Sequence, residues 1–395
     1  MPILPEKKHI LQWLRKNLLA VLFCLLLGII SAASFYSTEK SYITHTAIDN
    51  QGSDNVNHFE TDFSGSIFGK FTFLNVNGAM RKLLGQREMN GIVRLNNDYL
   101  ALPTDPVDES TLAANAASLG NLNRALTERG IPLLYVATPF KVSPRNPELP
   151  IGVADSTNEN MDVLLEHVRA EGVSCLDLRE AFNQNNIDPY NYFYRTDHHW
   201  NTRGGFYAYT QLVPQLESMM NTKIDSTLTD LSNYTITTYP SWHLGSYGQR
   251  TGQFFAGVDD FELIEPNFDT QIDRYYGFDY DCSGSFRDVI INTSPLQKRD
   301  LTQRLTYDAT LGTSLNHFFN ENASSDKKIL VIGDSMAKAV NPFLILSFRE
   351  VYTIDGYNPD ALSESLLAQY QPDIVMIMQY PTLMYDPDYF QYIIK

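Results

Sequence analysis

The sequence predicts an α/β domain with a doubly wound parallel sheet, a β-rich insertion and one N-terminal transmembrane helix. Three observations lead to this fold class. Short apolar runs alternate with helical patterns before residue 221 and again after residue 320, which is typical of a sheet covered by helices. Residues 221–320 interrupt that alternation. An uncharged apolar run lies near the start of the chain.

Nearly continuous apolar runs indicate the strands, because parallel strands are buried on both faces. The predicted strands are 131–138, 173–178, 328–332, 350–354 and 373–379. Apolar residues at helical spacing predict the helices between them. These helices are 108–129, 158–171, 203–220, 336–348 and 360–369, and a strand pair is expected around Asn96-Asn97-Asp98.

The segment 221–320 is rich in Tyr, Thr, Asn and Gly, and it alternates apolar with polar residues in places, as in Tyr234-Thr235-Ile236-Thr237. Such alternation favours half-buried strands. We therefore expect a β-rich insertion within one domain that extends over residues 66–395.

The uncharged run is residues 17–36, and about twenty apolar residues span a bilayer as a helix. Lys7, Lys8, Arg15 and Lys16 precede the run, so residues 1–16 are expected to stay in the cytoplasm. Residues 37–65 are polar and are expected to form a stalk outside the cell membrane. A cleavable signal peptide is the alternative, because residues 31–34 resemble a cleavage site. Both interpretations place the domain outside the membrane.

The formal net charge of −16 argues against nucleic-acid binding, which requires clustered positive charge. No cofactor is expected. Cys24, Cys175 and Cys282 are too few for a disulfide scaffold, although Cys175 and Cys282 could pair. Two free thiols are the preferred interpretation.

A serine follows the strand that ends at Gly333. The glycine permits a tight turn, and Gly333-Asp334-Ser335 then opens the helical pattern at 336–348. A helix N-terminus at this point would favour negative charge developing near Ser335. The alternative is structural, with Asp334 or Ser335 serving only as a helix cap.

A base for this serine is found in the stretch Asp197-His198-His199-Trp200-Asn201. Alternate residues of an extended segment point the same way, so Asp197 is expected to orient His199 while His198 points away. Two adjacent histidines and an aspartate could instead bind a metal, but a metal site is not expected, because no third ligand with suitable spacing lies nearby. Trp200 is expected to be a packing residue.

Asp-His-His-Trp-Asn with a downstream Gly-Asp-Ser resembles the DHHW family, which is related to the SGNH-hydrolase-like proteins of the AlgX and AlgJ type that O-acetylate alginate. The resemblance extends over most of the chain after about residue 85. It implies an SGNH-type fold, a polysaccharide or other glycan as substrate, and a catalytic triad of Ser335 as nucleophile, His199 as base and Asp197 as its orienting group.

Three further residues are candidates for substrate binding. Lys141 follows the strand 131–138, and ligands of open α/β sheets bind at the carboxyl ends of strands. Gly248 and Arg250 lie in a glycine-rich stretch that also resembles the family. A solvated loop lysine is an equally good interpretation of Lys141. A plain hairpin is an equally good interpretation of the stretch that contains Gly248 and Arg250.

The function expected from the sequence is a membrane-anchored O-acetyltransferase or carbohydrate esterase that acts on a cell-envelope or secreted polysaccharide. A membrane-bound acyl-transfer partner is a further expectation. The alternative is a non-catalytic scaffold that binds a glycan or a protein partner.

Overall fold

A computed structural model describes residues 16–48, 69–145, 147–184, 187–277, 279–301, 307, 310, 315–356, 362–385 and 394. The chain divides into two units, Met1–Ala79 and Met80–Lys395, which are described separately.

The N-terminal unit contains helix α2 (Leu18–Ile48), which is 31 residues long. Its segment Leu18–Tyr36 is the one stretch of the described residues that is long and apolar enough to cross a membrane, and most of its apolar side chains are exposed. The helix continues through Ile48, so the first part of the expected stalk is helical. The predicted cytoplasmic residues 1–15 and the rest of the stalk up to residue 65 lie outside the described residues.

Helix α4 (Lys70–Leu83) follows, and it crosses the boundary between the two units. The sequence analysis expected no helix there. Its apolar residues repeat at helical spacing, but two asparagines and a glycine interrupt the pattern.

The second unit is built on an eight-stranded sheet in the order β5-β4-β13-β11-β12-β10-β8-β9. The first five strands in this order are parallel to one another, which confirms the predicted fold class. They correspond to the five predicted runs: β4 (Leu133–Ala137), β5 (Ser174–Asp177), β11 (Ser325–Gly333), β12 (Phe348–Asp355) and β13 (Ile374–Gln379).

The central strands are buried on both faces, and alternate residues enter two different cores. In β11, Ile329 and Val331 enter one core, and Leu330 and Ile332 enter the other. Because side chains alternate along a strand, one continuous apolar run can serve both helix layers. The first core receives α8 (Thr202–Met220) and α13 (Asn341–Ser347), and the second receives α5 (Glu109–Thr127), α6 (Thr157–Ala170) and α14 (Glu364–Tyr370).

The helix predicted over 336–348 is broken. A short 3₁₀ turn, η5 (Ala337–Ala339), precedes α13, and the following residues have become strand β12. Pro342 explains the break, because proline lacks the backbone donor of a helix interior and fits the first turn of a new helix.

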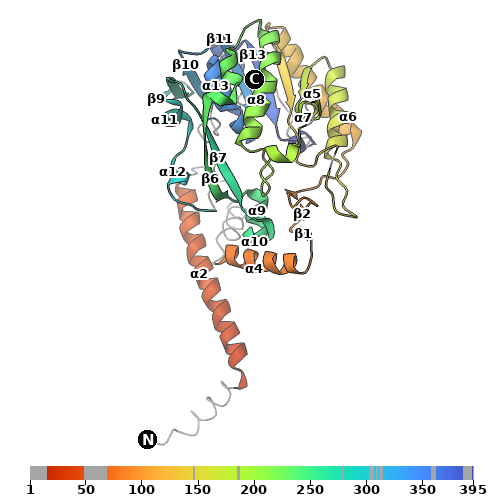
Figure 1. The fold of residues 1–395 in the computed structure, drawn as a ribbon, viewed down its shortest axis with the longest axis vertical. Coiled ribbons are helices and arrows are strands. Elements are labelled where there is room, and N and C mark those ends of the chain that lie inside the picture. Colours follow the sequence, from red (N-terminus) through yellow and green to blue (C-terminus); the bar gives the residue numbers. More distant parts are fainter. Residues whose placement is uncertain are drawn as a thin grey trace, which may run out of the picture. The chain divides into compact units, whose positions relative to one another are not determined.

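The insertion contributes to the sheet and also forms a separate pair of strands. Strands β8 (Ile272–Tyr276), β9 (Asp279–Gly284) and β10 (Asn316–Asn320) extend the sheet in antiparallel order. Strands β6 (Tyr234–His243) and β7 (Asp259–Pro266) pair with each other in a long ribbon outside it (Figure 1). Beyond β6 lie α9 (Ser246–Thr251) and α10 (Gln253–Ala256), so the glycine-rich stretch is helical and not a hairpin.

The remaining elements are short. Strands β1 (Glu88–Met89), β2 (Ile92–Arg94) and β3 (Leu100–Ala101) form a small sheet that includes the predicted strand pair, and the helices α7 (Leu178–Gln184), α11 (Phe286–Ile290) and α12 (Ser294–Gln297) join larger elements. Single 3₁₀ turns are η1 (Pro189–Tyr192), η2 (Ser226–Thr229), η3 (Leu231–Asn233) and η7 (Pro381–Tyr385). Cys24, Cys175 and Cys282 are all free thiols.

Candidate active site

The serine turn directly follows strand β11. The carboxylate of Asp334 is buried, and it accepts hydrogen bonds from the backbone N–H of Met336 at 2.8 Å and of Tyr380 at 2.6 Å. Burial raises the pKa of Asp334 to about 6, although these two hydrogen bonds act in the opposite direction. A side chain at Gly333 would lie 2.6 Å from Cβ of Ala337, so only glycine lets the turn close so tightly. Asp334 thereby ties the backbone that follows Ser335 to the segment that follows β13.

Ser335 lies in a turn that leads into the 3₁₀ segment η5, and α13 begins only at Asn341. The expectation that an α-helix N-terminus directly follows the serine is therefore wrong. A helix dipole acts mainly within the first turn of a helix, so α13 contributes little at Ser335.

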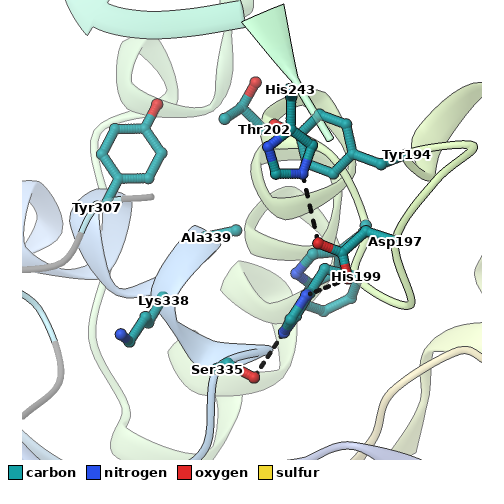
Figure 2. Close-up of a pocket in the computed structure, with 10 residues that line it drawn as sticks. Tyr194, Asp197, His199, Thr202, His243, Tyr307, Ser335, Lys338 and Ala339 are labelled. Atoms are coloured by element: carbon teal, nitrogen blue, oxygen red, sulfur yellow. Dashed lines mark hydrogen bonds and ion pairs between the residues drawn. The ribbon is translucent and has the colours of Figure 1, made fainter. Parts of the chain in front are cut away.

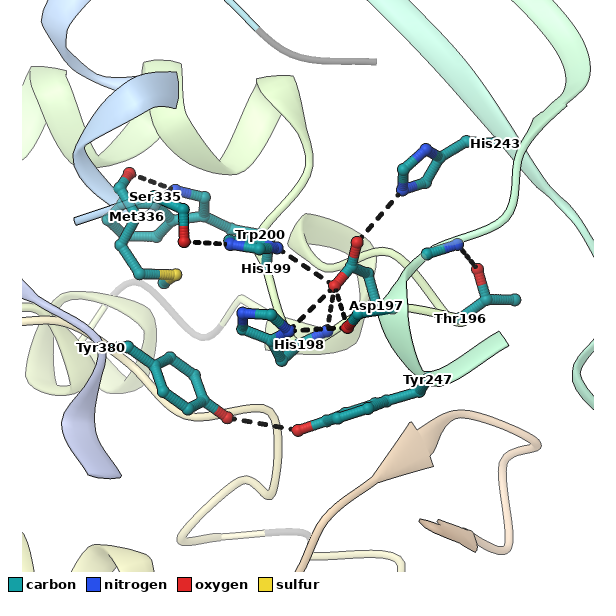
Figure 3. Close-up of polar contacts among 12 residues, drawn as sticks. Thr196, Asp197, His198, His199, Trp200, His243, Tyr247, Ser335, Met336 and Tyr380 are labelled. Atoms are coloured by element: carbon teal, nitrogen blue, oxygen red, sulfur yellow. Dashed lines mark hydrogen bonds and ion pairs between the residues drawn. The ribbon is translucent and has the colours of Figure 1, made fainter. Parts of the chain in front are cut away.

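Ser335, His199 and Asp197 form one hydrogen-bonded chain (Figure 3). Nε2 of His199 lies 2.6 Å from Oγ of Ser335, and Nδ1 of His199 lies 3.1 Å from Oδ1 of Asp197. A neutral imidazole with its proton on Nδ1 satisfies both contacts, because it donates to the carboxylate and accepts from the hydroxyl. This is the arrangement that general-base activation of a serine requires.

The loop that carries Asp197 and His199 is not extended as predicted. Phe193 and Trp200 pair across its base in an antiparallel bridge, and the residues between them form turns and bends. His198 therefore faces the same carboxylate as His199, with its Nδ1 3.0 Å from Oδ1 of Asp197. The expectation that His198 points away is wrong.

Asp197 is 7% exposed and is surrounded by donors. Besides the two neighbouring histidines, the hydroxyl of Ser246 donates to Oδ1 at 2.8 Å, and Nε2 of His243 lies 3.3 Å from Oδ2. Burial would raise the pKa of Asp197, but the electrostatic interaction with His199 and the hydrogen bonds from the three imidazoles hold this pKa well below its ordinary value. The carboxylate therefore stays ionised.

His243 and Ser246 were missed in the sequence. Both lie in the insertion: His243 is the last residue of the long strand β6 and Ser246 is the first residue of α9. Neither belongs to the motif at Asp197. Gly245 lets this segment approach, because a Cβ there would lie 2.2 Å from Cβ of Asp197. The glycine and the two polar residues within the segment 243–246 are the sequence signal that could have indicated the contact.

Trp200 links the loop to the serine turn. Its indole is 2% exposed, and Nε1 donates to the carbonyl oxygen of Met336 at 3.0 Å. Trp200 is thus buried as expected, and it also holds the backbone next to Ser335. Asn201 caps α8, with its side chain accepting from the N–H of Gly204 at 2.9 Å.

A small cavity of about 40 Å³ adjoins the serine. In Figure 2 the hydrogen bonds run from His243 through Asp197 and His199 to Ser335 along one side, and Tyr307 and Lys338 lie on the other. The other lining residues are Tyr194, Trp200, Thr202 and Ala339. Nδ1 of His243 is buried and has no hydrogen-bond partner among the described residues.

The chain is similar to known proteins in part of its sequence and in its fold. Residues 98–235 match the family model described as SGNH hydrolase-like domain, acetyltransferase AlgX. The chain therefore has the fold of an SGNH hydrolase-like domain. The matched stretch includes Asp197 and His199 and ends before Ser335.

Solved structures of two proteins share this fold. Bacillus cereus PatB1 is 18% identical, with a TM-score of 0.63, and the alignment covers 76% of this chain and 99% of that one. A DHHW family protein from Eubacterium siraeum DSM 15702 is 16% identical, with a TM-score of 0.58 and coverage of 78% and 97%. PatB1 has also been solved with a sulfonyl adduct, at a TM-score of 0.60, 18% identity and coverage of 78% and 98%. No curated protein matches the sequence.

Lys141 lies at the expected end of β4, but its side chain turns inward and is only 1% exposed. Nζ donates to the carbonyl oxygens of Leu100 at 2.8 Å and Arg195 at 3.2 Å, and also to that of Asp197. Burial lowers the pKa of Lys141 to about 7, against the attraction of nearby carboxylates. Lys141 thus holds the loop that carries Asp197 and His199 through hydrogen bonds to the loop backbone. The sequence predicted instead a position at the rim of the site.

Gly248 and Arg250 lie in α9 and not in the lining of the cavity. The N–H of Gly248 donates to the carbonyl oxygen of Thr196 at 2.8 Å, and a Cβ there would lie 2.4 Å from Leu244. The guanidinium of Arg250 donates to the carbonyl oxygen of Asn90 at 2.9 Å. In the structure both residues make contacts that position α9.

Asp197, His198 and His199 also bring three potential metal ligands within 4.8 Å of one another, which the sequence analysis did not expect. Carboxylate and imidazole donors suit a transition metal. The contacts described above already use these groups, and a metal on Nδ1 of His199 would displace its hydrogen bond to Asp197. These three residues can therefore take part in the hydrogen-bonded chain to Ser335 or bind a metal, but they cannot do both at once.

Proposed function

We propose that this protein is an extracytoplasmic O-acyltransferase or esterase whose nucleophile is Ser335 and whose substrate is a cell-envelope or secreted polysaccharide. The observation that supports this most directly is the hydrogen-bonded chain from Asp197 through His199 to Ser335. The family model that matches residues 98–235 describes an acetyltransferase domain and supports the same class of reaction.

In the first step, Oγ of Ser335 attacks the carbonyl carbon of an acyl donor, and Nε2 of His199 takes the hydroxyl proton. The tetrahedral intermediate collapses when His199 returns that proton to the leaving group, which yields an acyl-enzyme. Asp197 holds the imidazole by its Nδ1–H and stabilises the imidazolium that forms.

In the second step, a hydroxyl group takes the place of the leaving group. His199 removes the proton of this hydroxyl group while the hydroxyl oxygen attacks the carbonyl carbon of the acyl-enzyme. The bond between that carbon and Oγ of Ser335 then breaks, and His199 returns the proton to Oγ. A sugar hydroxyl gives transfer and water gives hydrolysis. The two outcomes use the same residues, so access of water to the acyl-enzyme decides between them.

The size of the cavity supports a short acyl group. The space open to the centre of a water-sized sphere is about 40 Å³, and about 10–15 Å³ of such space is enough to hold one water, so the cavity has room for a few heavy atoms. An acetyl group contains only a few heavy atoms and is of similar size. The aromatic rings of Tyr194, Trp200 and Tyr307 in the lining offer apolar surface to its methyl group.

We further propose that α2 anchors the protein in the cell membrane, with the domain outside. The run Leu18–Tyr36 has the length and composition of a membrane span, and the basic residues before it favour a cytoplasmic N-terminus. A membrane-bound protein that delivers acyl groups is the partner that such an anchor would favour.

Reaction with a sulfonyl fluoride tests the nucleophile, because this reagent attaches covalently to an activated serine. We expect adduct formation on Ser335 in the wild type and its loss in Ser335→Ala. Ser246→Ala is the matched control, because its hydroxyl contacts Asp197 but does not contact Nε2 of His199. An unreactive wild-type protein that is folded would contradict the proposal and favour a non-catalytic scaffold.

Incubation with an aryl acetate then distinguishes transfer from hydrolysis. A transferase should release the aryl alcohol faster when an oligosaccharide acceptor is present, and the oligosaccharide should gain acetyl groups. An esterase should release acetate at the same rate with or without the oligosaccharide.

A further inference from the structure

Helix α4 has an exposed apolar face. Four large side chains at spacings of three, four and three residues lie on that face, and each is more than half exposed: Phe73, Val76, Met80 and Leu83. Residues at these spacings share one side of a helix. The buried residues of α4 are instead Asn75 and Gly78. Helix α4 thus exposes its apolar stripe, whereas a surface helix of a soluble protein buries that stripe.

The charge of this segment also differs from that of the whole chain. Residues 69–87 contain Lys70, Arg81, Lys82 and Arg87 and no acidic residue, whereas the formal net charge of the chain is −16. Positive charge beside an apolar stripe is the pattern of helices that lie in the surface of membranes with anionic lipids. A protein partner of equal fit would need an acidic rim around an apolar groove.

The position of α4 in the chain agrees with this pattern. Among the described residues, α4 is the first helix after the apolar segment Leu18–Tyr36 of α2. If that segment is in the bilayer, the chain itself keeps α4 close to the lipid surface, and a tethered segment binds at a high effective concentration.

We propose that α4 lies in the interface of an anionic membrane, with the stripe of Phe73, Val76, Met80 and Leu83 in the acyl boundary and the basic side chains among the headgroups. The anchor would then have two parts, a span and a surface helix. The surface helix would keep the domain that begins after it from rotating freely around its tether. This inference rests on the anchoring proposed above and is independent of the chemistry at Ser335.

Spin labelling of the full-length chain in lipid nanodiscs tests the proposal. Cys24, Cys175 and Cys282 are replaced by alanine, and one nitroxide is attached to Val76→Cys or Met80→Cys. Collisions with oxygen report a lipid environment, and collisions with a water-soluble nickel chelate report an aqueous one. Matched controls are Leu26→Cys in the apolar run and Ile151→Cys, whose native side chain is fully exposed.

We expect the nitroxides at 76 and 80 to collide more with oxygen than with nickel, as at residue 26, and the nitroxide at 151 to do the reverse. The oxygen preference should decrease when the anionic lipid is replaced by phosphatidylcholine. Preference for nickel at 76 and 80 would overturn the proposal. So would protection from both reagents, since that result indicates burial against protein, either another copy or another segment.

The control at residue 26 separates the two claims. A nickel-accessible nitroxide at 26 would contradict the membrane span itself, whereas an oxygen-accessible nitroxide at 26 with nickel access at 76 and 80 would contradict only the surface helix. Hydrolysis of a soluble aryl acetate should be unchanged by Val76→Cys, because α4 takes no part in the reaction.

Discussion

Nε2 of His243 lies 3.3 Å from Oδ2 of Asp197, so a second imidazole contacts the carboxylate that orients His199. The contact joins strand β6 of the insertion to the loop that carries Asp197 and His199. His243 is buried beside Tyr194, with ring centroids 4.4 Å apart, so its ring has little freedom to turn. We interpret His243 as a positioning residue that fixes the plane of the carboxylate.

Substitutions at His243 can separate this role from mere packing. The amide of His243→Gln reaches about as far as Nε2 and can still donate to Asp197, whereas His243→Asn is too short. We expect His243→Asn to lower kcat by roughly tenfold to a hundredfold, which corresponds to about 1.5–3 kcal/mol for a hydrogen bond to a charged group. His243→Gln should retain most of kcat. Equal losses in the two variants would indicate a structural role only.

Asp197→Asn should abolish most of the turnover. The amide would present an N–H where His199 Nδ1–H needs an acceptor, so the imidazole would favour the wrong tautomer. The corresponding change in a serine protease lowers kcat by about 10⁴, and a loss on that order is expected here. His199→Ala and Ser335→Ala should lose as much, and the double variant should be scarcely worse than either single variant. Additive losses in a hydrolysis assay would show that the three residues do not act as a unit.

His198→Ala should retain far more activity than His199→Ala. Of the two adjacent imidazoles, His199 is the one with Nε2 2.6 Å from Oγ of Ser335, whereas Nδ1 of His198 lies 2.8 Å from Oγ of Ser246. Thermal unfolding of both variants controls for loss of structure. If His198→Ala is inactive and His199→Ala turns over normally, the base has been assigned to the wrong histidine.

The ionised Asp197 should stabilise the fold at neutral pH but not in acid. Its pKa is lowered in the folded state, whereas an aspartate in an unfolded chain titrates near about 3.9. A carboxyl whose pKa falls on folding contributes stability above its unfolded pKa, and this contribution disappears as pH falls towards the folded pKa.

Urea unfolding at several pH values measures this effect. The free energy of unfolding should be lower in Asp197→Asn than in the wild type at pH 7, and the difference should shrink below about pH 5. Asp279→Asn, at an exposed position, should show little difference at any pH. A constant difference between wild type and Asp197→Asn would place the effect in packing and not in ionisation.

Removal of metal ions should leave the activity intact. The proposed chemistry needs Nδ1 of His199 to donate to Asp197, and a metal held by Asp197, His198 and His199 would displace that hydrogen bond. Dialysis against a chelator should therefore not reduce aryl acetate hydrolysis, and added Zn²⁺ should inhibit it. Loss of activity on chelation, restored by one metal, would instead support a metal centre.

The strands and the residues of the hydrogen-bonded chain from Asp197 through His199 to Ser335 could be predicted from the sequence, because each depends on a local pattern. The run from Lys328 to Ile332 is apolar without interruption, and a sheet with helices on both faces is the simplest way to bury it. The motif at Asp197 and the Gly-Asp-Ser turn are likewise contained in a few consecutive residues.

Features that depend on how distant segments meet were not predictable in the same way. Ser246 and His243 reach Asp197 only because β6 returns past the loop. Lys141 turns inward and donates to carbonyl oxygens of Leu100, Arg195 and Asp197, which come from segments far from it in the sequence. The helix after Ser335 is displaced by Pro342, a local signal that the apolar periodicity of 336–348 obscured.

Trapping of the acyl-enzyme tests the central claim most directly. The purified chain is incubated briefly with an aryl acetate, quenched in acid, and analysed by mass spectrometry after proteolysis. We expect one acetyl group on the peptide that contains Ser335. More of this acetylated peptide should accumulate in the wild type than in His199→Ala. Acetate release by the wild type without any acetyl group on Ser335, or with the acetyl group on another residue, would contradict it.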